Sequence, residues 1–270
     1  MENLIEVTDL HHAYNSHEVL KGINLTIPQG KIVGIMGASG SGKSTLLRHL
    51  TGQLRPSRGS VKFMGKVLHE LSDRELYQLR LNMGMMFQVS GLFTDLSVYD
   101  NVAFPLRETS DLPEEMIRDL VMMKLNAVGL RGAHKLMPSE LSGGMERRVA
   151  MARATAADPP LIIYDEPFAG LDPISLSTIA NLIRTLNNAL GVTSVVVTYD
   201  LAESLKIVDY IYFIHDGLVV AEGEVGELNR SPNAFVKQFL YGESDGPVPF
   251  HYPSKPYPAD LFNHASKASR

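Results

Sequence analysis

Short apolar runs alternate with segments of helical spacing along most of this 270-residue chain. The runs are bounded by turn residues and are too short for helices, which is typical of buried strands; they occupy residues 31–36, 161–164, 193–198 and 210–214. Apolar residues at helical spacing, such as Leu46, Leu47 and Leu50, lie between them. Buried strands that alternate with helices predict an α/β fold, in which the helices connect the strands of a parallel sheet.

The pattern changes in two regions. From about residue 92 to residue 157 the strand signals fade and helical, methionine-rich sequence replaces them, which predicts a helical insertion between two parts of one sheet. The last segment, residues 246–270, contains five prolines and four aromatic residues. We expect this segment to be extended, because proline interrupts helices and favours extended backbone.

Composition narrows the class of protein. Hydrophobic residues make up 44% and charged residues 20%, which is the balance of a folded globular chain rather than a disordered one. The net charge of −5 argues against nucleic acid as a partner. Because the chain has no cysteine, a disulfide framework, a thiolate metal site and a cysteine nucleophile are excluded.

The N-terminal residues do not form a signal peptide, because they carry acidic residues and lack a basic segment followed by an apolar run. Nowhere does an apolar run approach the ~18 residues that a membrane helix needs. We therefore expect the chain to stay in the cytoplasm and not to cross a membrane by itself.

One segment has the pattern of a phosphate-binding loop. It fits G-x-x-x-x-G-K-[ST], directly after the predicted strand at residues 31–36 and before the helical stretch at residues 46–50. Glycines let backbone N–H groups turn toward an anion, the lysine neutralises the outer phosphates, and the serine after it can bind Mg²⁺. The loop residues are Gly37, Ala38, Ser39, Gly40, Ser41, Gly42, Lys43, Ser44 and Thr45.

Two further motifs lie downstream. The strand at residues 161–164 ends in Asp165 and Glu166; beside a phosphate loop, the first can hold Mg²⁺ through water and the second can orient or deprotonate the attacking water. Ser142, Gly143 and Gly144 precede a stretch of helical spacing, where free N–H groups and the helix dipole favour an anion. Taken alone, the first motif is more simply a solvated strand end and the second a helix N-cap.

The order and spacing of these motifs resemble the ATP-binding-cassette (ABC) ATPases over residues 5–240. The resemblance implies a P-loop NTPase fold with a RecA-like core, an antiparallel β subdomain and a helical subdomain at about residues 92–157, all within residues 1–241. It implies ATP and Mg²⁺ as cofactors and ATP hydrolysis as the activity. It also implies a head-to-tail dimer that holds two ATP molecules between its subunits.

The resemblance assigns roles to single residues. Tyr14 corresponds to the aromatic residue that stacks on adenine, and Gln88 corresponds to the glutamine that reaches Mg²⁺ and the attacking water. Residues 142–144 correspond to the signature segment, which closes on ATP held by the opposite subunit, and Asp172 lies in the loop that crosses the dimer interface. The implied catalytic residues are Lys43, Gln88, Glu166 and Tyr199, and the implied Mg²⁺ ligands are Ser44, Gln88 and Asp165.

One position departs from the family pattern. Where the family usually has Thr-His-Asp, this chain has Thr198, Tyr199 and Asp200. The family histidine senses the γ-phosphate; the tyrosine side chain is longer, although its hydroxyl still donates one hydrogen bond. We expect a slower but active ATPase, and the alternative is a regulator that binds ATP with little turnover.

The spacing of the motifs indicates which kind of ABC ATPase this is. Gln88 and Ser142 are only 54 positions apart, which leaves no room for long coiled coils, and a single set of motifs argues against fused soluble members. What remains is a subunit that drives a separate membrane partner. In transporters of this family the segment after the glutamine, here residues 89–106, forms a groove for a cytoplasmic helix of the permease. The alternative is core packing of Leu92, Phe93 and Phe104.

Several stretches closely resemble the ATPase subunits of Mla (maintenance of lipid asymmetry) phospholipid transport systems, among them residues 90–95, 121–125, 129–132, 135–145 and 245–250. The resemblance implies a peripheral subunit at the cytoplasmic face of the inner membrane. Its implied partners are a multi-span permease, an MCE-domain lipid-binding protein and a small STAS-domain protein. An ABC importer for another solute is the rival, because the ATPase does not contact the cargo.

The C-terminal tail, residues 242–270, is expected to pack on the sister subunit in the same family. Its possible anchors are Phe250, Tyr252, Tyr257 and Phe262. From composition alone, a flexible tail without fixed structure is the simpler interpretation.

The nine histidines show no metal-ligand spacing beyond the adjacent pair His11 and His12. We interpret this pair as ordinary surface or packing residues, and the twelve methionines as adaptable core residues.

Overall fold

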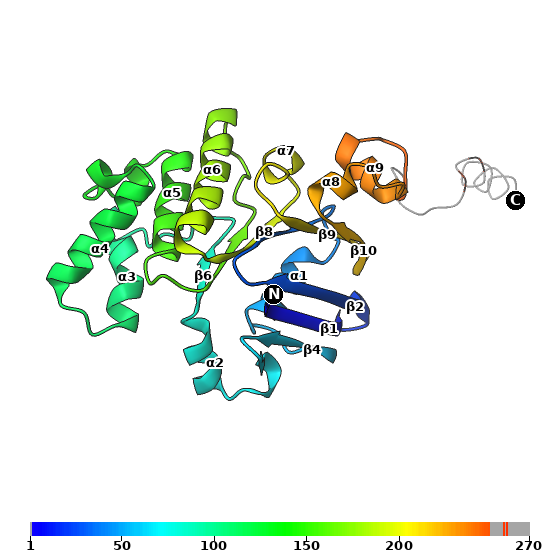
Figure 1. The fold of residues 1–270 in the computed structure, drawn as a ribbon, viewed down its shortest axis with the longest axis horizontal. Coiled ribbons are helices and arrows are strands. Elements are labelled where there is room, and N and C mark those ends of the chain that lie inside the picture. The colour runs from blue at the N-terminus through cyan, green and yellow to red at the C-terminus, as the bar shows by residue number, and fades with distance from the viewer. Residues whose placement is uncertain (1, 249–255, 257, 259–270) are drawn as a thin grey trace, which may run out of the picture. The chain divides into compact units, whose positions relative to one another are not determined.

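A computed structural model describes residues 2–248, 256 and 258 of the chain. The chain divides into two compact units, residues 1–228 and residues 229–270, and each is described by itself. The first unit contains two sheets, and Figure 1 shows a group of helices beside the larger of them. Within the described residues, no helix is long and apolar enough to cross a membrane.

The larger sheet has six strands in the order β10-β9-β3-β8-β7-β6. The five strands from β9 to β6 are parallel, and β10 pairs antiparallel with β9. Four of the parallel strands coincide with the predicted apolar runs. The strands are β3 (Ile32–Met36), β6 (Met83–Met86), β7 (Leu161–Asp165), β8 (Thr193–Thr198), β9 (Tyr210–His215) and β10 (Leu218–Gly223).

The parallel register brings the carboxyl ends of four strands to one edge of the sheet. Met36 at the end of β3 pairs with Thr198 at the end of β8, and Asp165 at the end of β7 pairs with Val197. Met86 at the end of β6 pairs with Tyr164. Residues that follow these four strands therefore lie next to one another, although they are far apart in the sequence.

The smaller sheet is antiparallel and has the order β2-β1-β4-β5. Its strands are β1 (Asn3–Tyr14), β2 (His17–Pro28), β4 (Arg58–Phe63) and β5 (Lys66–Val67). Apolar side chains of β1, β2 and β4 share one buried core with β3, β7 and β8 of the larger sheet. This core holds the two sheets together, and it includes Leu46, Leu47 and Leu50 of the helix that follows the phosphate loop.

Helices lie between the strands. The helix α1 (Lys43–Leu50) leads from β3 to the smaller sheet, and the 3₁₀ turn η1 (Leu68–Glu70) and α2 (Asp73–Arg80) lead back to β6. The helices α6 (Pro173–Leu190) and α7 (Leu201–Ser204) connect β7 to β8 and β8 to β9, and α8 (Val225–Leu228) follows β10. The sequence between β6 and β7 forms α3 (Val98–Thr109), α4 (Glu114–Ala127), α5 (Gly143–Ala154) and the 3₁₀ turns η2 (Arg131–Ala133) and η3 (Pro138–Glu140). The helices α3, α4 and α5 bury their own apolar cluster.

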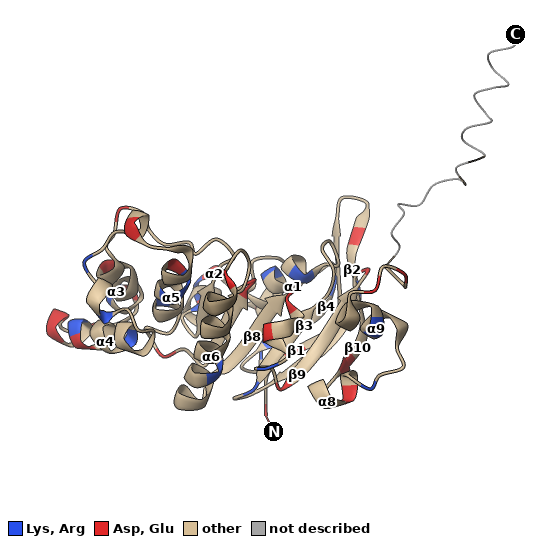
Figure 2. Cartoon of the chain, turned by 90° about the horizontal axis from the view of Figure 1, so that it is seen from above, with Lys and Arg blue, Asp and Glu red and all other residues tan. Residues whose placement is uncertain are grey.

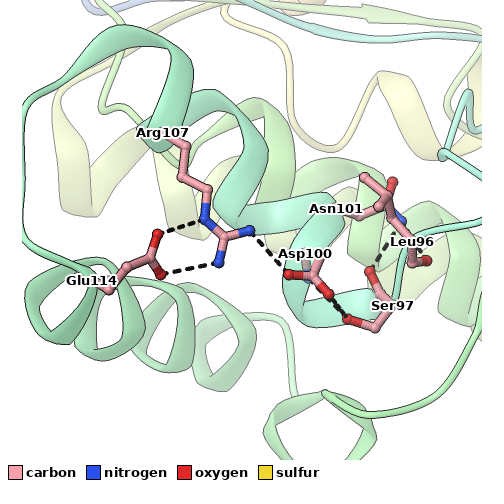
Figure 3. A network of polar contacts seen from close by, with 6 residues as sticks. All are labelled: Leu96, Ser97, Asp100, Asn101, Arg107 and Glu114. Atoms are coloured by element: carbon pink, nitrogen blue, oxygen red, sulfur yellow. Dashed lines mark hydrogen bonds and ion pairs between the residues drawn. The ribbon is translucent and has the colours of Figure 1, made fainter.

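An ion-pair network joins α3 to α4 at the surface. The guanidinium of Arg107 donates to both carboxylate oxygens of Glu114, at 2.7 and 3.0 Å, and to Asp100 at 3.0 Å (Figure 3). Both helices carry charges of both signs (Figure 2), and α4 has acidic residues in its first turn and a lysine in its last, which complements the helix dipole. Because the three side chains are partly exposed, the network adds little to the stability of this region. Its effect is to orient α3 and α4 relative to each other.

The second unit contains α9 (Ala234–Tyr241), whose N-terminus is capped by Asn233. The Gln238 amide accepts a hydrogen bond from the Val248 N–H at 2.8 Å and donates one to the Val248 carbonyl at 2.9 Å. This pair of bonds ties Val248 to α9. The predicted tail anchors Phe250, Tyr252, Tyr257 and Phe262 lie outside the described residues.

Candidate active site

A cleft of about 350 Å³ opens where the parallel strands end. It brings together the phosphate loop after β3, Gln88 after β6, Glu166 after β7 and Tyr199 after β8. The residues that line it are Val19, Ser39, Gly40, Gly42, Lys43, Ser44, Thr45, Gln88, Glu166 and Tyr199. Residues separated by up to 180 positions in the sequence thus share one cleft because the strand order is not the sequence order.

The phosphate loop runs from β3 into the N-terminus of α1. Gly37 has a φ of 155° and lies against β9, where a Cβ atom would come within 2.1 Å of the Ile214 carbonyl oxygen. Gly42 has a φ of 106° and immediately precedes the first residue of α1. The first turn of α1 therefore lines the cleft, and the N–H groups of a first helical turn, which have no partner within the helix, are suited to bind phosphate. The hydroxyl of Ser41 is buried and has no hydrogen-bond partner among the described residues.

The ammonium of Lys43 is almost completely buried in this loop. It donates to the carbonyl oxygens of Gly37 at 2.7 Å and of Ala38 at 3.0 Å. Burial lowers the pKa of Lys43, and the negative charges of Glu166 and Asp165 oppose that shift. The ammonium therefore provides positive charge to the cleft from a position fixed by the loop itself.

The carboxylate of Glu166 lies opposite the loop and is only 8% exposed. Its backbone has a φ of 47°, and its N–H donates to the Val197 carbonyl at 2.8 Å, which turns the residue out of β7 toward the cleft. The Tyr199 N–H approaches one of its carboxylate oxygens at 3.4 Å. Burial raises the pKa of Glu166, against the opposing effects of a Thr198 hydrogen bond, the Tyr199 N–H and Lys43. A raised pKa makes this carboxylate a better proton acceptor.

The other residues predicted in the cleft differ in exposure. Gln88 is exposed, and the side chain of Tyr199 is 54% exposed, so both can reach a ligand without first breaking a contact. Asp165 ends β7 next to Glu166, and burial raises its pKa while Lys43 and Arg147 oppose the shift. Its carboxylate does not line the cleft directly, although its charge acts on Lys43.

A second group of predicted residues lies outside the cleft, at the N-termini of α5 and α6. Ser142 caps α5 by accepting the Met145 N–H at 3.3 Å. Asp172 caps α6 by accepting the Ser175 N–H at 3.1 Å and the Ser175 hydroxyl at 2.6 Å. The two caps touch, because a Cβ atom on Gly144 would lie 2.7 Å from the Ser175 hydroxyl oxygen. The structure thus joins residues 142–144 and Asp172 to each other.

Tyr14 lies apart from both groups within its own sheet. It ends β1, is 41% exposed, and its ring contacts the ring of His12 at a centroid distance of 4.7 Å. It does not line the cleft.

Three residues of the site were given no role from the sequence, although Thr198 lies in the segment that departs from the family pattern. Val19 of β2 lines the cleft, and Thr198 bonds Glu166. Arg147 of α5 is 9% exposed, and it donates to the Phe87 carbonyl at 2.9 Å and to the Ala169 carbonyl at 3.4 Å. Arg147 therefore ties the signature helix both to the segment before Gln88 and to the segment before Asp172.

An apolar groove of about 570 Å³ lies between the sheet and the helices. Phe93 and Phe104 line it, are about 40% exposed, and contact each other at a ring-centroid distance of 4.7 Å. Leu92, in contrast, packs against the apolar cluster of α3, α4 and α5. The alternative of core packing is therefore right for Leu92 and wrong for the two phenylalanines.

A phosphate loop, an acidic strand end, a glutamine after β6 and a separate helical signature segment define an ATPase of the ABC class. The family model for ABC transporters matches residues 20–169. The chain is 54% identical to the intermembrane phospholipid transport system ATP-binding protein MlaF of Haemophilus influenzae, over 97% of this chain and 99% of that protein. It is 51% identical to MlaF of Escherichia coli strain K12, over 96% of each chain.

Solved ABC cassettes have the same fold. The dimeric post-hydrolysis structure of MJ0796 bound to ADP and Pi superimposes with a TM-score of 0.75 at 32% identity, covering 82% of this chain and 98% of that chain. CbiO1 from Clostridium perfringens gives a TM-score of 0.80 at 32% identity, covering 89% and 96%. The chain belongs to the ABC transporter ATPases and, within them, to the MlaF-like ATP-binding subunits. The predicted fold class and the predicted ATPase activity are thereby confirmed.

Proposed function

We propose that this chain binds and hydrolyses ATP to drive phospholipid transport between the inner and outer membranes through a separate permease. The observation that carries the proposal is the near full-length identity of 54% and 51% to two MlaF proteins, in a chain whose phosphate loop and Glu166 share one cleft. The geometry of the cleft supports ATP hydrolysis, and the names of the relatives indicate phospholipid as the cargo. An importer of another solute is not favoured, because these relatives are phospholipid transport ATPases by name.

The donor atoms of the cleft fit Mg²⁺, a hard cation that prefers oxygen ligands. Ser44 and Gln88 line the cleft with a hydroxyl and an amide oxygen. Asp165 does not line the cleft but ends β7 at the same edge of the sheet, where its carboxylate can hold Mg²⁺ through water. When bound, Mg²⁺ neutralises charge on the phosphate oxygens. We assign these three residues as its ligands.

The protein contributes position and electrostatics to hydrolysis. The loop N–H groups and the Lys43 ammonium hold the β- and γ-phosphates, and Lys43 exchanges its loop carbonyl partners for phosphate oxygens. Glu166 orients the attacking water and accepts its proton, for which its raised pKa suits it. Gln88 and the Tyr199 hydroxyl are exposed to the same space and contact the water and the γ-phosphate.

Tyr199 affects how fast ATP is hydrolysed, and not whether it is hydrolysed at all. Its backbone N–H supports Glu166 whatever side chain it carries, so the carboxylate keeps its position in the absence of the family histidine. The exposed tyrosine side chain, by contrast, loses rotamer entropy when it closes on the phosphate. This supports a slower motor rather than a regulator without turnover.

The second group of residues acts on ATP bound by the sister subunit. The N-terminus of α5 at residues 142–144 presents free N–H groups, and Asp172 with Ser175 fixes it against α6. Ile174 at the start of α6 is 81% exposed, as expected of a residue that a second copy covers. The solved relative MJ0796 is dimeric. We assign the group to a head-to-tail dimer with two ATP molecules at its interface, where Tyr14 stacks on adenine.

The remaining partners follow from the relatives and the groove. The exposed aromatic residues of the groove suit the apolar face of a cytoplasmic helix of a multi-span permease. We place the subunit at the cytoplasmic face of the inner membrane, with an MCE-domain protein and a small STAS-domain protein in the same assembly. The division into an ATPase domain at residues 1–241, with its helical subdomain at residues 92–157, and a tail at 242–270 that contacts the sister subunit belongs to the same proposal.

An affinity purification from detergent-solubilised membranes tests the assignment. The tagged chain is expected to recover a multi-span permease together with an MCE-domain protein and a small STAS-domain protein. A matched chain carrying Phe93→Ser and Phe104→Ser should lose the permease while still binding ATP. Recovery of a permease with a different solute-binding protein, or of soluble proteins alone, would contradict the phospholipid assignment.

A further inference from the structure

Two histidines that the hydrolysis mechanism does not use form a ring ladder behind Tyr14. The ring of His49 contacts the ring of His12 at a centroid distance of 4.7 Å and an interplanar angle of 69°. The ring of His12 in turn contacts the ring of Tyr14 at 4.7 Å and 78°. Each contact is edge to face, the arrangement that aromatic rings prefer.

The ladder spans two parts of the molecule. His49 lies on α1, the helix that begins with Lys43 of the phosphate loop, and is 1% exposed. His12 and Tyr14 lie two residues apart on β1, and the contact between their rings places both side chains on the same side of that strand. The exposed Tyr14 ring is thus connected, through two rings, to the helix that carries the phosphate site.

The ring nitrogens of the two histidines are buried and contribute little to hydrogen bonding. Both ring nitrogens of His12 are buried and have no hydrogen-bond partner among the described residues. The pKa of His49 is lowered to about 4, mainly by burial and further by His12, against a weak opposing contact with the Leu54 backbone. His49 is therefore uncharged near neutral pH, and its ring acts through packing.

The neighbouring residue His11 differs from His12 because its ring nitrogens have hydrogen-bond partners. His11 points to the opposite face of β1, where its two ring nitrogens contact Glu18 at 2.8 Å and Asp9 at 3.1 Å. A buried imidazole without such partners is costly compared with an aliphatic side chain of the same size. Filling space under β1 therefore does not by itself account for His12, whereas a rigid ring edge against Tyr14 does.

We propose that His12, held by His49, is a positioning residue that fixes the Tyr14 ring in the orientation that stacks on the adenine base of ATP. The proposal rests on the proposed function in one respect, the stacking of Tyr14 on the base. A tyrosine that is 41% exposed has free rotamers, and ordering it on binding costs entropy. The edge of His12 restricts those rotamers beforehand, which strengthens binding without adding a contact to the ligand.

Binding of two ligands to the full-length chain separates this role from a structural one. Isothermal titration calorimetry with Mg²⁺ measures the affinity for adenylyl imidodiphosphate, which has the base, and for inorganic tripolyphosphate, which has only the phosphates. His12→Leu keeps the apolar volume and removes the ring edge, His12→Phe restores an edge, and His11→Leu is the matched control.

We expect His12→Leu to weaken binding of the adenine nucleotide roughly three- to tenfold, the scale of one lost aromatic contact, and to leave tripolyphosphate binding unchanged. His12→Phe should restore the affinity, and His11→Leu should leave both affinities unchanged. Tyr14→Ala should weaken nucleotide binding at least as much, and adding His12→Leu to it should cause no further loss.

Unchanged nucleotide affinity in His12→Leu, or equal weakening of both ligands, would overturn the proposal. If Tyr14→Ala itself leaves nucleotide binding unchanged, the base-stacking role of Tyr14 is wrong and the positioning role falls with it, so the two failures are distinguishable. Should His12→Leu not fold, His49→Leu removes the support from the other end of the ladder and carries the same expectations.

Discussion

Asn101 of α3 holds the loop that forms one wall of the apolar groove, and replacing it with leucine is expected to destabilise the fold. The side chain is completely buried, and it lies beside Leu96 and Ser97 (Figure 3). Its oxygen accepts the Phe93 N–H at 2.8 Å, and its amide group donates to the carbonyl oxygens of Phe93, Leu96 and Ser97, each at 3.0 Å. One side chain thus pairs four backbone groups of a loop that has no regular structure.

The magnitude follows from the groups that lose their partner. The Phe93 carbonyl keeps a bond from the Leu96 N–H, and the Ser97 carbonyl keeps one from the Asn101 N–H. The Phe93 N–H and the Leu96 carbonyl keep none among the described hydrogen bonds. Each unpaired buried polar group costs about 1–3 kcal/mol, so the two together cost about 4 kcal/mol. The apolar burial of leucine offsets about 2 kcal/mol of this cost, so we expect Asn101→Leu to lower the free energy of unfolding by about 2 kcal/mol.

Urea unfolding followed by circular dichroism measures this change, a suitable probe because the chain has no tryptophan. Asn126→Leu, the same substitution at an exposed position of α4, is the matched control and should change the free energy by less than about 0.5 kcal/mol. A loss of less than about 1 kcal/mol in Asn101→Leu would refute the reasoning, because the loop would then pair its backbone without this side chain.

Four other predictions concern the cleft and the sheet. Glu166→Gln should lower phosphate release at least ~100-fold while ATP still binds, and near-normal release would remove Glu166 as the base. Because burial raises the pKa of Glu166, wild-type turnover should fall on acidification at a higher pH than an ordinary glutamate would give; a profile flat down to the usual glutamate range would speak against this. Tyr199→His should raise steady-state turnover, and a decrease would show that the tyrosine is the better group here. Gly84→Ala should destabilise the fold by about 1–3 kcal/mol in thermal unfolding, because its Cβ would lie 2.1 Å from the Ala154 carbonyl oxygen, whereas Gly132→Ala, which meets nothing, should not.

The parallel sheet could be predicted from the sequence because its strands are buried on both faces and appear as continuous apolar runs. β3 and β8 are buried along their whole length. The strand β1 shows no such pattern, because bulges interrupt its pairing with β2, and Asp9 in one of them has a φ of 46°. The antiparallel sheet was therefore expected only from the family resemblance, and not from periodicity.

The phosphate loop was predictable as a unit because its nine residues are contiguous. The meeting of Glu166 with Tyr199 depends on the strand order, which the sequence does not contain. Arg147 was missed for a different reason. It falls off the apolar face of α5 and has the pattern of an exposed residue, yet it is buried because two backbone carbonyls pair its guanidinium.

Reconstitution of the chain with its co-purified permease in proteoliposomes tests the central claim most directly. The measurement is the transfer of labelled phospholipid to or from acceptor vesicles, recorded together with phosphate release, for the wild-type chain and for Glu166→Gln. We predict transfer that requires ATP and is lost in Glu166→Gln, since Glu166 faces the phosphate loop across the cleft. Phosphate release without any phospholipid transfer, or transfer of equal rate in Glu166→Gln, would contradict the account.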